Sequence, residues 1–450
     1  MKLRLTAIEE GYMVDSDLRS QLQELRNTYV YPTKTALYKK PVSLVKGKGA
    51  RVWDESGQEY LDAIGGIVCI SVGHNHPKIK KKIISMLEED EIQHSSHLYL
   101  SLYMEGLAEK LAQLAPDVPR SCYITNSGSE ANEVAILTAR VATGEQMLIA
   151  LRHSYHGGTN ATLGLCGHSS WRYPHQGSSG VAHAVAPYCY RCPFGANNRT
   201  CQLECADDVQ NVAETVTSGR VAGIIVEPIL GVGGFIDPPT EYHSKVFDII
   251  KSFGGLYISD EVQTGVGRTG LSFFAIDQSG VVPDIITMAK GLGSGAPIGA
   301  VIADKKHANQ LQGKLHFNTF GGDPYQSMQA AMVIDIIKEE GLIENAQQVG
   351  ARLKKGLLEL QEQFSIIGDV RGRGLLLGLE LVKDRKTKEP ATEECKALLE
   401  FCKSEGLLVG KGGLWGQVVR IAPPLNLNCL EADELIFKLK NAFVLLTQTS

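Results

Sequence analysis

Six short apolar runs, separated by helix-like stretches, are the feature that most constrains the fold of this chain. Each run is bounded by turn residues, and its apolar character is continuous rather than alternating, which is typical of strands covered on both faces. We therefore predict an α/β domain around a mostly parallel sheet. The runs are 121–125 (SCYIT), 147–151 (MLIAL), 223–228 (GIIVEP), 256–261 (LYISDE), 284–289 (DIITMA) and 298–303 (IGAVIA).

The rest of the chain follows other patterns. A length of 450 residues exceeds what one hydrophobic core usually supports. Residues 49–62 predict a hairpin, 326–364 long amphipathic helices and 370–382 a strand-like stretch. We predict a large domain and a smaller α+β domain, with the boundaries 1–65 (a segment that joins the small domain), 66–325 (large domain) and 326–450 (small domain).

Charge and composition argue against two classes of partner. The net charge is −5, and the sequence has no long basic block, so we expect no nucleic-acid or membrane binding. No run is long and apolar enough to span a bilayer. The N-terminal stretch 1–18 lacks the apolar core of a signal peptide and is too acidic for a transit peptide, which predicts a cytoplasmic protein.

Four of the ten cysteines lie close together in the sequence, at Cys189, Cys192, Cys201 and Cys205. The first pair has the C-x-x-C spacing with which two thiolates can face one tetrahedral ion, and the second pair could supply the other two ligands. The alternatives are a surface loop with free thiols and disulfide pairing. A metal here would be structural.

Two glycine-containing turns follow predicted strands. Asn126-Ser127-Gly128-Ser129-Glu130-Ala131-Asn132 stands between the run at 121–125 and a helical stretch, so its free backbone N–H groups suit a phosphate, although Ser127 also suits an ordinary helix cap. His153-Ser154-Tyr155-His156-Gly157-Gly158 follows the run at 147–151 and places an aromatic side chain at a strand end. The alternative for this tyrosine is a packed loop residue.

Two charged residues also end apolar strands. Asp260 needs a cation or hydrogen-bond donors opposite it, because a buried carboxylate is costly without them. Lys290 closes the run at 284–289 before a glycine segment, so it either extends outward or has a lowered pKa that suits imine chemistry. The glycines at 265, 267 and 270 match a dinucleotide-binding spacing, but DEVQ separates them from the strand and no clean helix follows, so we reject an NAD site and expect a loop at a subunit interface.

A phosphate cradle, an aromatic side chain, a strand-end aspartate and a strand-end lysine together match the needs of pyridoxal phosphate. The sequence also resembles the class III (omega) aminotransferases, which have the fold type I of pyridoxal-phosphate enzymes, and most of all their alanine–glyoxylate branch. The resemblance implies a seven-stranded sheet between helices. It rests on GHNHP (73–77), NSGSEAN, YHG, VEP, DEVQTGVGRTG, PDIITMAKG, FNTFGG (317–322), GDVRGRGL (368–375) and VRIAPPL (419–425).

The resemblance also implies roles for single residues. Lys290 would form the imine with the cofactor and carry the proton, Asp260 would pair with the pyridine nitrogen, and Gln263 would lie near the phenolic oxygen. Gly128 and Ser129 would bind the phosphate, and Tyr155 would stack on the ring. Thr319 would reach the phosphate of a neighbouring subunit, which implies an obligate homodimer and leaves a tetramer open. The other expected cofactor-site residues are Ser127, His156, Glu227 and Val262.

Substrate expectations come from three positions. Arg420 would grip a substrate carboxylate, with the pocket walls near Ile67, Val68 and Tyr99. Val232 stands where related enzymes carry a glutamate that masks this arginine, and Gly158 stands where they carry an arginine for a second carboxylate. We expect a ping-pong aminotransferase that uses a small 2-oxo acid, pyruvate or glyoxylate, unless Arg191 or Arg268 supplies a second cationic site.

Three other functions are the alternatives to an aminotransferase. A phospho-lyase or an amino-acid racemase would use the same residues, because only the fate of the carbanion differs. An NAD-dependent oxidoreductase would rest on the glycines alone. A non-catalytic scaffold would have lost part of the site, and none of the expected residues is missing.

Overall fold

The computed structural model describes residues 18–33, 37–115, 117–174, 180–195 and 200–449. Residues 1–17 lie outside this part, so the cytoplasmic location expected from the N-terminus stays a prediction. In the described part, no helix combines the length and the apolar character that crossing a membrane requires.

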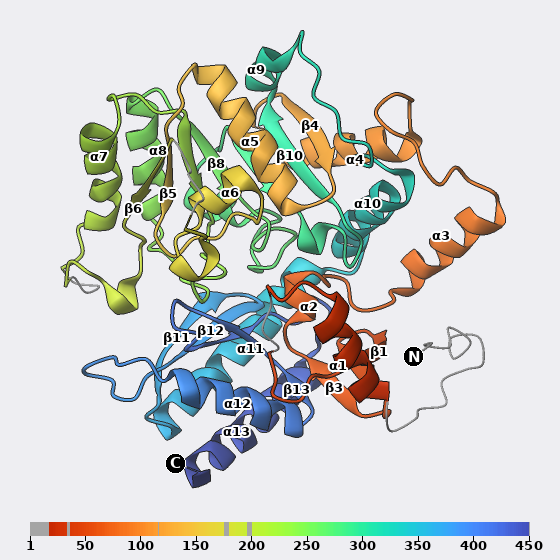
Figure 1. Cartoon of the computed structure of the whole chain (residues 1–450), viewed down its shortest axis with the longest axis vertical. Coiled ribbons are helices and arrows are strands. Elements are labelled where there is room, and N and C mark those ends of the chain that lie inside the picture. Colours follow the sequence, from red (N-terminus) through yellow and green to blue (C-terminus); the bar gives the residue numbers. More distant parts are fainter. Residues whose placement is uncertain (1–17, 34–36, 116, 175–179, 196–199, 450) are drawn as a thin grey trace.

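A seven-stranded sheet forms the large domain and confirms the predicted α/β class (Figure 1). β10 is antiparallel to both of its neighbours, whereas the β5–β6, β5–β7, β7–β8 and β8–β9 pairs are parallel. The strands, in spatial order, are β4 (Arg120–Thr125), β10 (Gly299–Asp304), β9 (Ile285–Met288), β8 (Leu256–Asp260), β7 (Gly223–Val226), β5 (Leu148–Leu151) and β6 (Val181–Ala184).

Helices cover both faces of this sheet, which explains why β5, β7, β8, β9 and β10 are buried at every position. β6 escaped prediction because only its alternate residues are fully buried, so it forms no continuous apolar run. The helices and helical turns of this part are α2 (Gly65–Val68), α3 (Pro77–Glu88), α4 (Leu102–Gln113), α5 (Gly128–Thr143), α6 (Asn160–Leu165), α7 (Glu204–Val216), α8 (Tyr242–Ser252), α9 (Lys305–Ala308) and α10 (Pro324–Glu339).

Two smaller sheets lie beside the large domain. One has the order β11 (Ile367–Arg373), β12 (Leu376–Leu381), β15 (Val418–Ile421) and β14 (Gly410–Gly412); the other joins β1 (Leu44–Lys48), β2 (Arg51–Asp54) and β3 (Glu59–Asp62) to β13 (Leu407–Leu408). The predicted hairpin at 49–62 is confirmed as β2–β3. The helices here are α1 (Leu18–Tyr29), α11 (Leu342–Gln363), α12 (Thr392–Ser404) and α13 (Cys429–Thr449).

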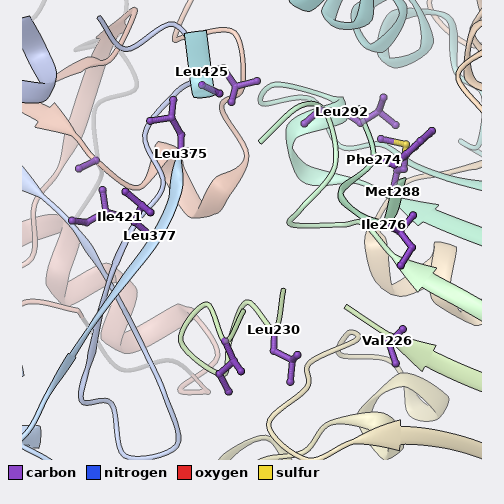
Figure 2. Packing of buried hydrophobic residues seen from close by; sticks show 14 of the residues in the cluster. Val226, Leu230, Phe274, Ile276, Met288, Leu292, Leu375, Leu377, Ile421 and Leu425 are labelled. Atoms are coloured by element: carbon purple, nitrogen blue, oxygen red, sulfur yellow. The ribbon is translucent and has the colours of Figure 1, made fainter. Parts of the chain in front are cut away.

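Both parts of the molecule share one hydrophobic cluster (Figure 2). Leu377 and Ile421 of the small sheet belong to it, as do Val226 and Met288 at the ends of large-domain strands. These contacts do not test the predicted domain boundaries. They show that α10 packs against α4 of the large domain and that β3 pairs with β13 in one of the smaller sheets. The carboxyl ends of the parallel strands therefore pack in the same hydrophobic cluster as the small sheet.

A first prediction concerns the close approach of α11 to the β11–β12 turn. A methyl group on Gly350 would lie 2.3 Å from the carbonyl oxygen of Gly374, which is backbone and cannot rotate away. We expect Gly350→Ala to destabilise the protein by about 2 kcal/mol, because overpacking costs more than the gain in helix propensity. Thermal unfolding measures this difference.

Gly106→Ala is the matched control, because Gly106 lies inside α4 and a Cβ there would have nothing within 4 Å. We expect this variant to be stabilised by about 0.5 to 1 kcal/mol. Equal effects of the two substitutions would contradict the close approach.

Candidate functional site

Asp260 is the buried carboxylate at the end of β8, and donors from three segments satisfy it. Its Oδ2 accepts a hydrogen bond from Nδ2 of Asn132 at 2.8 Å and lies 2.7 Å from Nδ1 of His156. Its Oδ1 accepts from the backbone N–H of Val262 at 3.0 Å. The predicted partners of this aspartate are thus confirmed, and Asn132 gains a role that the sequence did not suggest, although it stands one helical turn after Gly128.

Lys290 follows β9 and begins a short 3-10 turn with a left-handed backbone conformation (φ +44°). Burial lowers the pKa of Lys290, and Asp260, Cys69 and Glu227 oppose this shift. The expected amine of lowered pKa is therefore confirmed in direction. The turn packs against α2, and a Cβ on Gly291 would lie 2.7 Å from Cγ2 of Val266, so only glycine fits after the lysine.

The turn before α5 forms the helix cap that the sequence suggested, while its phosphate role stays a prediction. Ser127 is the N-cap, and its Oγ accepts from the backbone N–H of Glu130 at 3.2 Å. Gly128 is required because a Cβ would lie 2.9 Å from Val262, and the Oγ of Ser129 accepts from the backbone N–H of Gly158 at 3.0 Å. The N-terminus of a long helix thus meets the ends of β5 and β8, where its dipole favours an anion.

Glu227 and Gln263 lie under the same site. Glu227 follows β7 and accepts from the backbone N–H groups of Tyr155 at 2.9 Å and Gly231 at 2.8 Å. Burial raises the pKa of Glu227 to about 7, while His156 opposes the shift. Gln263 contacts Gly231 so closely that a Cβ there would lie 2.3 Å from its Nε2, and its Oε1 has no hydrogen-bond partner among the described residues.

Two aromatic rings stand together at the end of β5. The ring centroids of Tyr155 and Trp171 are 4.8 Å apart with the planes at 59°. Trp171 was not predicted, because a single tryptophan in an irregular segment carries no periodic signal. Next to the tyrosine, Nε2 of His156 is buried without a partner among the described residues, so one ring nitrogen is left for a ligand.

Arg420 enters the site from β15 of the small sheet. Its Nη1 donates to the carbonyl oxygen of Gly231 at 3.4 Å, and its guanidinium lies 5.4 Å from the ring centroid of Phe235. Burial lowers the pKa of Arg420 to about 10. No acidic side chain of the described chain pairs with it, and its Nε has no partner there either. A buried guanidinium in this state suits an incoming carboxylate.

The remaining predicted site residues differ in how far they are buried. Val68 is buried beside the Lys290 turn with a positive φ of 61°, whereas Ile67 and Tyr99 are exposed. Thr319 is also exposed, in a turn next to Asn318, whose Oδ1 accepts from Nδ2 of Asn126 at 2.8 Å. The turn that carries Thr319 is therefore hydrogen-bonded to the turn before α5 of the same chain, which is the predicted phosphate site.

Of the three alternatives for the four clustered cysteines, the structure shows free thiols. No group of three or more His, Cys, Asp or Glu side chains in the described ranges, which include all four positions, is arranged to hold a metal ion. All four are free thiols. Burial raises the pKa of Cys189 and raises that of Cys205 to about 12, and the neighbouring cysteine thiols add to both shifts.

The glycine-rich loop after β8 packs against α11, and its expected place at a subunit interface stays a prediction. Residues 262–271 form successive turns and no helix, which agrees with the rejection of an NAD site. A Cβ on Gly267 would lie 2.5 Å from Ile343, and one on Gly270 would lie 2.6 Å from Gln347. The close packing of α11 therefore leaves no room for a side chain at either position. Arg268 in this loop donates to the carbonyl oxygen of Pro423, while its Nε and Nη2 have no partner among the described residues. Because its side chain is fully buried, it has no exposed surface for a second substrate carboxylate.

Comparisons with known proteins agree with this geometry. A family model for class-III aminotransferases matches residues 34–443. A protein of Arabidopsis thaliana named alanine–glyoxylate aminotransferase 2 homolog 2, mitochondrial, is 43% identical over 91% of this chain and 84% of its own length. The leucine/methionine racemase of Thermococcus litoralis is 37% identical over 93% and 94%.

Solved structures agree in fold as well. An amine transaminase from an uncultivated Pseudomonas species, in its pyridoxal-phosphate-bound form, superposes with a TM-score of 0.87 and 29% identity over 93% of this chain and 98% of that one.

A second prediction concerns Glu261, which follows Asp260 and is fully buried without a cation in the described chain. Burial raises its pKa from 4.5 to about 7. Because the unfolded chain releases this proton near pH 4.5, the stability of the native protein falls as pH rises from there to about 7, by about 3 kcal/mol. Gln cannot ionise, so Glu261→Gln should raise the melting temperature at pH 8 and change it little at pH 4.5.

Glu362→Gln on the exposed face of α11 is the control, and we expect no pH-dependent difference from it. A gain for Glu261→Gln that is equal at both pH values would argue against a buried ionising carboxyl.

Proposed function

Because the chain belongs to the class-III aminotransferase family and acts as an aminotransferase, we propose that it transfers an amino group from an amino acid such as alanine to a small 2-oxo acid, pyruvate or glyoxylate. The observation that carries this proposal is Arg420, which is buried at the site and has no acidic partner in the described chain. Donor and acceptor each bring one carboxylate, and each would occupy this guanidinium in turn.

Pyridoxal phosphate is the cofactor that the family implies, and the polar atoms of the site fit it. Nε2 of His156 and Oε1 of Gln263 are buried without partners in the described chain, and the turn at Gly128 opens the long helix α5. Lys290 would hold the cofactor through its amine, Asp260 would keep the pyridine nitrogen protonated, and the N-terminus of α5 would bind the phosphate. When bound, the cofactor supplies an electron sink for the bond broken at the substrate Cα.

The side chains of this protein divide the remaining work. Arg420 binds the substrate carboxylate through its planar fork and so fixes the substrate Cα relative to Lys290. The amine of Lys290, once free, removes the proton from Cα, and its lowered pKa keeps part of it neutral for this task. Tyr155 and Trp171 pack together at the end of β5 and would line one side of the site.

The preference for a small acceptor rests on two positions. Val232 presents no carboxylate to Arg420, so this arginine stays available in both half-reactions. Gly158 has no side chain, and a Cβ there would meet only the hydroxyl oxygen of Tyr155, at 3.9 Å. Nothing at this position provides a cation for the second carboxylate of 2-oxoglutarate.

The third prediction is a comparison of acceptors. With L-alanine or another amino acid as donor, kcat/KM for glyoxylate or pyruvate should exceed that for 2-oxoglutarate by about tenfold or more, because a second carboxylate would be desolvated without a partner. Lys290→Ala should abolish turnover. Higher kcat/KM for 2-oxoglutarate would refute the argument from Gly158.

Gly158→Arg sharpens this comparison, because the open space at Gly158 admits a longer side chain. We expect the variant to gain activity with 2-oxoglutarate relative to pyruvate. Gly144→Arg, at the C-cap of α5 with nothing within 4 Å of its Cβ position, is the control and should leave the ratio unchanged.

The racemase relative identifies the alternative outcome. A racemase would invert L-alanine and exchange its Cα hydrogen with solvent deuterium without consuming a 2-oxo acid. An aminotransferase would convert the enzyme to its amine form with alanine alone, with an equal amount of pyruvate released.

A homodimer is part of the proposal, supported by an exposed apolar surface. The segments 92–102 and 315–320 adjoin, since the rings of His94 and Phe320 are 5.1 Å apart and Gly321 lies against His97. Leu100 is 95% exposed and Leu315 is fully exposed, which is unusual for a free surface. The same surface carries Thr319, whose expected role is at the partner's phosphate.

The fourth prediction tests this surface. Light scattering should give twice the mass of the chain for the wild type, and Leu100→Asp with Leu315→Asp should shift it to the monomer and lower the activity. Phe437→Asp on α13 replaces another exposed apolar side chain and should change neither. A monomeric, active wild-type protein would exclude the dimer.

A further inference from the structure

Glu380 of β12 is a fully buried carboxylate that four side chains share. Its Oε1 accepts from Nε of Arg191 at 2.5 Å and from Nε2 of Gln417 at 3.2 Å. Its Oε2 accepts from Nη1 of Arg371 at 2.6 Å and from the hydroxyl of Tyr188. Burial alone would raise the pKa of Glu380, but Arg371, Tyr188 and Arg191 hold it below the ordinary value, so the carboxylate stays charged.

This carboxylate lies on the same face of the small sheet as Arg420. Glu380 is opposite Val418 in the β12–β15 register, and Arg420 is two residues further along β15. Successive side chains of a strand alternate between its faces, so Val418 and Arg420 point to the same side, which is the side of Glu380. One short stretch of strand therefore separates the shared carboxylate from the substrate arginine.

The partners of Glu380 also fix the loop on which Arg420 rests. Nε of Arg371 donates to the carbonyl oxygen of Gly234 at 2.8 Å. Gly234 belongs to the loop 231–235, which supplies both the carbonyl oxygen of Gly231 and the ring of Phe235 to Arg420. The backbone N–H of Gly413 donates to Val232 in the same loop at 2.9 Å.

Arg191 connects this cluster to the large domain. It ends the 3-10 turn Cys189–Arg191, and its guanidinium lies 5.2 Å from the ring centroid of Trp415. Trp415 donates its backbone N–H to Oε1 of Gln417, so Arg191 contacts the loop before β15 through a ring and through Glu380. The guanidinium thus bridges the segment after β6 and the strand of Arg420.

We propose that Arg191 and Glu380 are positioning residues for carboxylate recognition, which hold the β15 strand and the loop 231–235 so that Arg420 points into the site. The inference rests on the proposed role of Arg420 and deepens it. Arg191 is already ion-paired with Glu380 inside the cluster, so we assign it no carboxylate site of its own. Its loss would loosen Arg420 and weaken the grip on any substrate carboxylate, while the amine chemistry at Lys290 would be unaffected.

The test compares two probes that differ in a carboxylate. Aminooxyacetate and O-methylhydroxylamine both attack the cofactor of the holoenzyme, and their rates are followed by the change in its absorbance. The ratio of the two second-order rate constants reports how much the carboxylate contributes. We expect Arg191→Met to lower this ratio about fivefold to tenfold, the size of one lost charge-assisted contact.

Two further variants and a steady-state readout complete the design. Arg191→Lys keeps the charge opposite Glu380 but not the planar stacking on Trp415, so its ratio should be intermediate. KM for alanine should rise in parallel with little change in kcat. Arg373→Lys is the matched control, because Arg373 also joins β11 to the large domain, through Asp237, but has no contact with Glu380, and its ratio should equal that of the wild type.

Arg420→Met separates this inference from the proposed function. If it leaves the ratio unchanged, the carboxylate role of Arg420 itself is wrong. If it abolishes the carboxylate preference while both Arg191 variants keep the wild-type ratio, the positioning role of Arg191 and Glu380 is overturned. Melting temperatures of all variants identify any loss of folding, and Arg191→Lys, which retains the ion pair, decides the case if Arg191→Met does not fold.

Discussion

The burial of Asp260 at the end of a central strand is the constraint on which the site depends. A carboxylate in this position needs donors, and they come from the chain around it: Asn132 on α5, His156 after β5 and the backbone of Val262. Each donor belongs to a segment with a second task at the site. The hydrogen bonds to this one buried carboxylate thus hold the turn before α5 and the segment after β5 next to the end of β8.

The sequence predicted the elements that obey a local rule. Buried strands appear as continuous apolar runs, and the residues at their carboxyl ends converge because parallel strands end at one edge, so Asp260, Lys290, Tyr155 and Gly128 could be found without a structure. β6 is short and only half buried, so it gave no such run. The orientation of β10 also had no local signature, because antiparallel and parallel buried strands have the same composition.

Contacts between distant segments account for what the sequence could not supply. Trp171 reaches Tyr155 from an irregular segment, and Glu380 gathers partners from positions 188, 191, 371 and 417. The cysteines show the opposite error. Their spacing fits a metal site, but spacing does not fix side-chain directions. No group of three or more possible ligands in the described chain is placed to hold an ion, although these thiols lie close enough to raise one another's pKa.

The buried arginines show how the fold assigns different tasks to one chemical group. Arg191 pairs with Glu380, Arg371 pairs with both Glu380 and Asp369, and Arg268 is fully buried and donates to the backbone carbonyl of Pro423. Burial lowers the pKa of Arg268 and Arg420 alike to about 10, so desolvation alone does not identify a binding residue. What distinguishes Arg420 is its place: it acts electrostatically on Lys290 and rests on a loop that Arg371 holds. A cation kept unpaired at such a place costs stability, and the substrate carboxylate restores that loss when it binds.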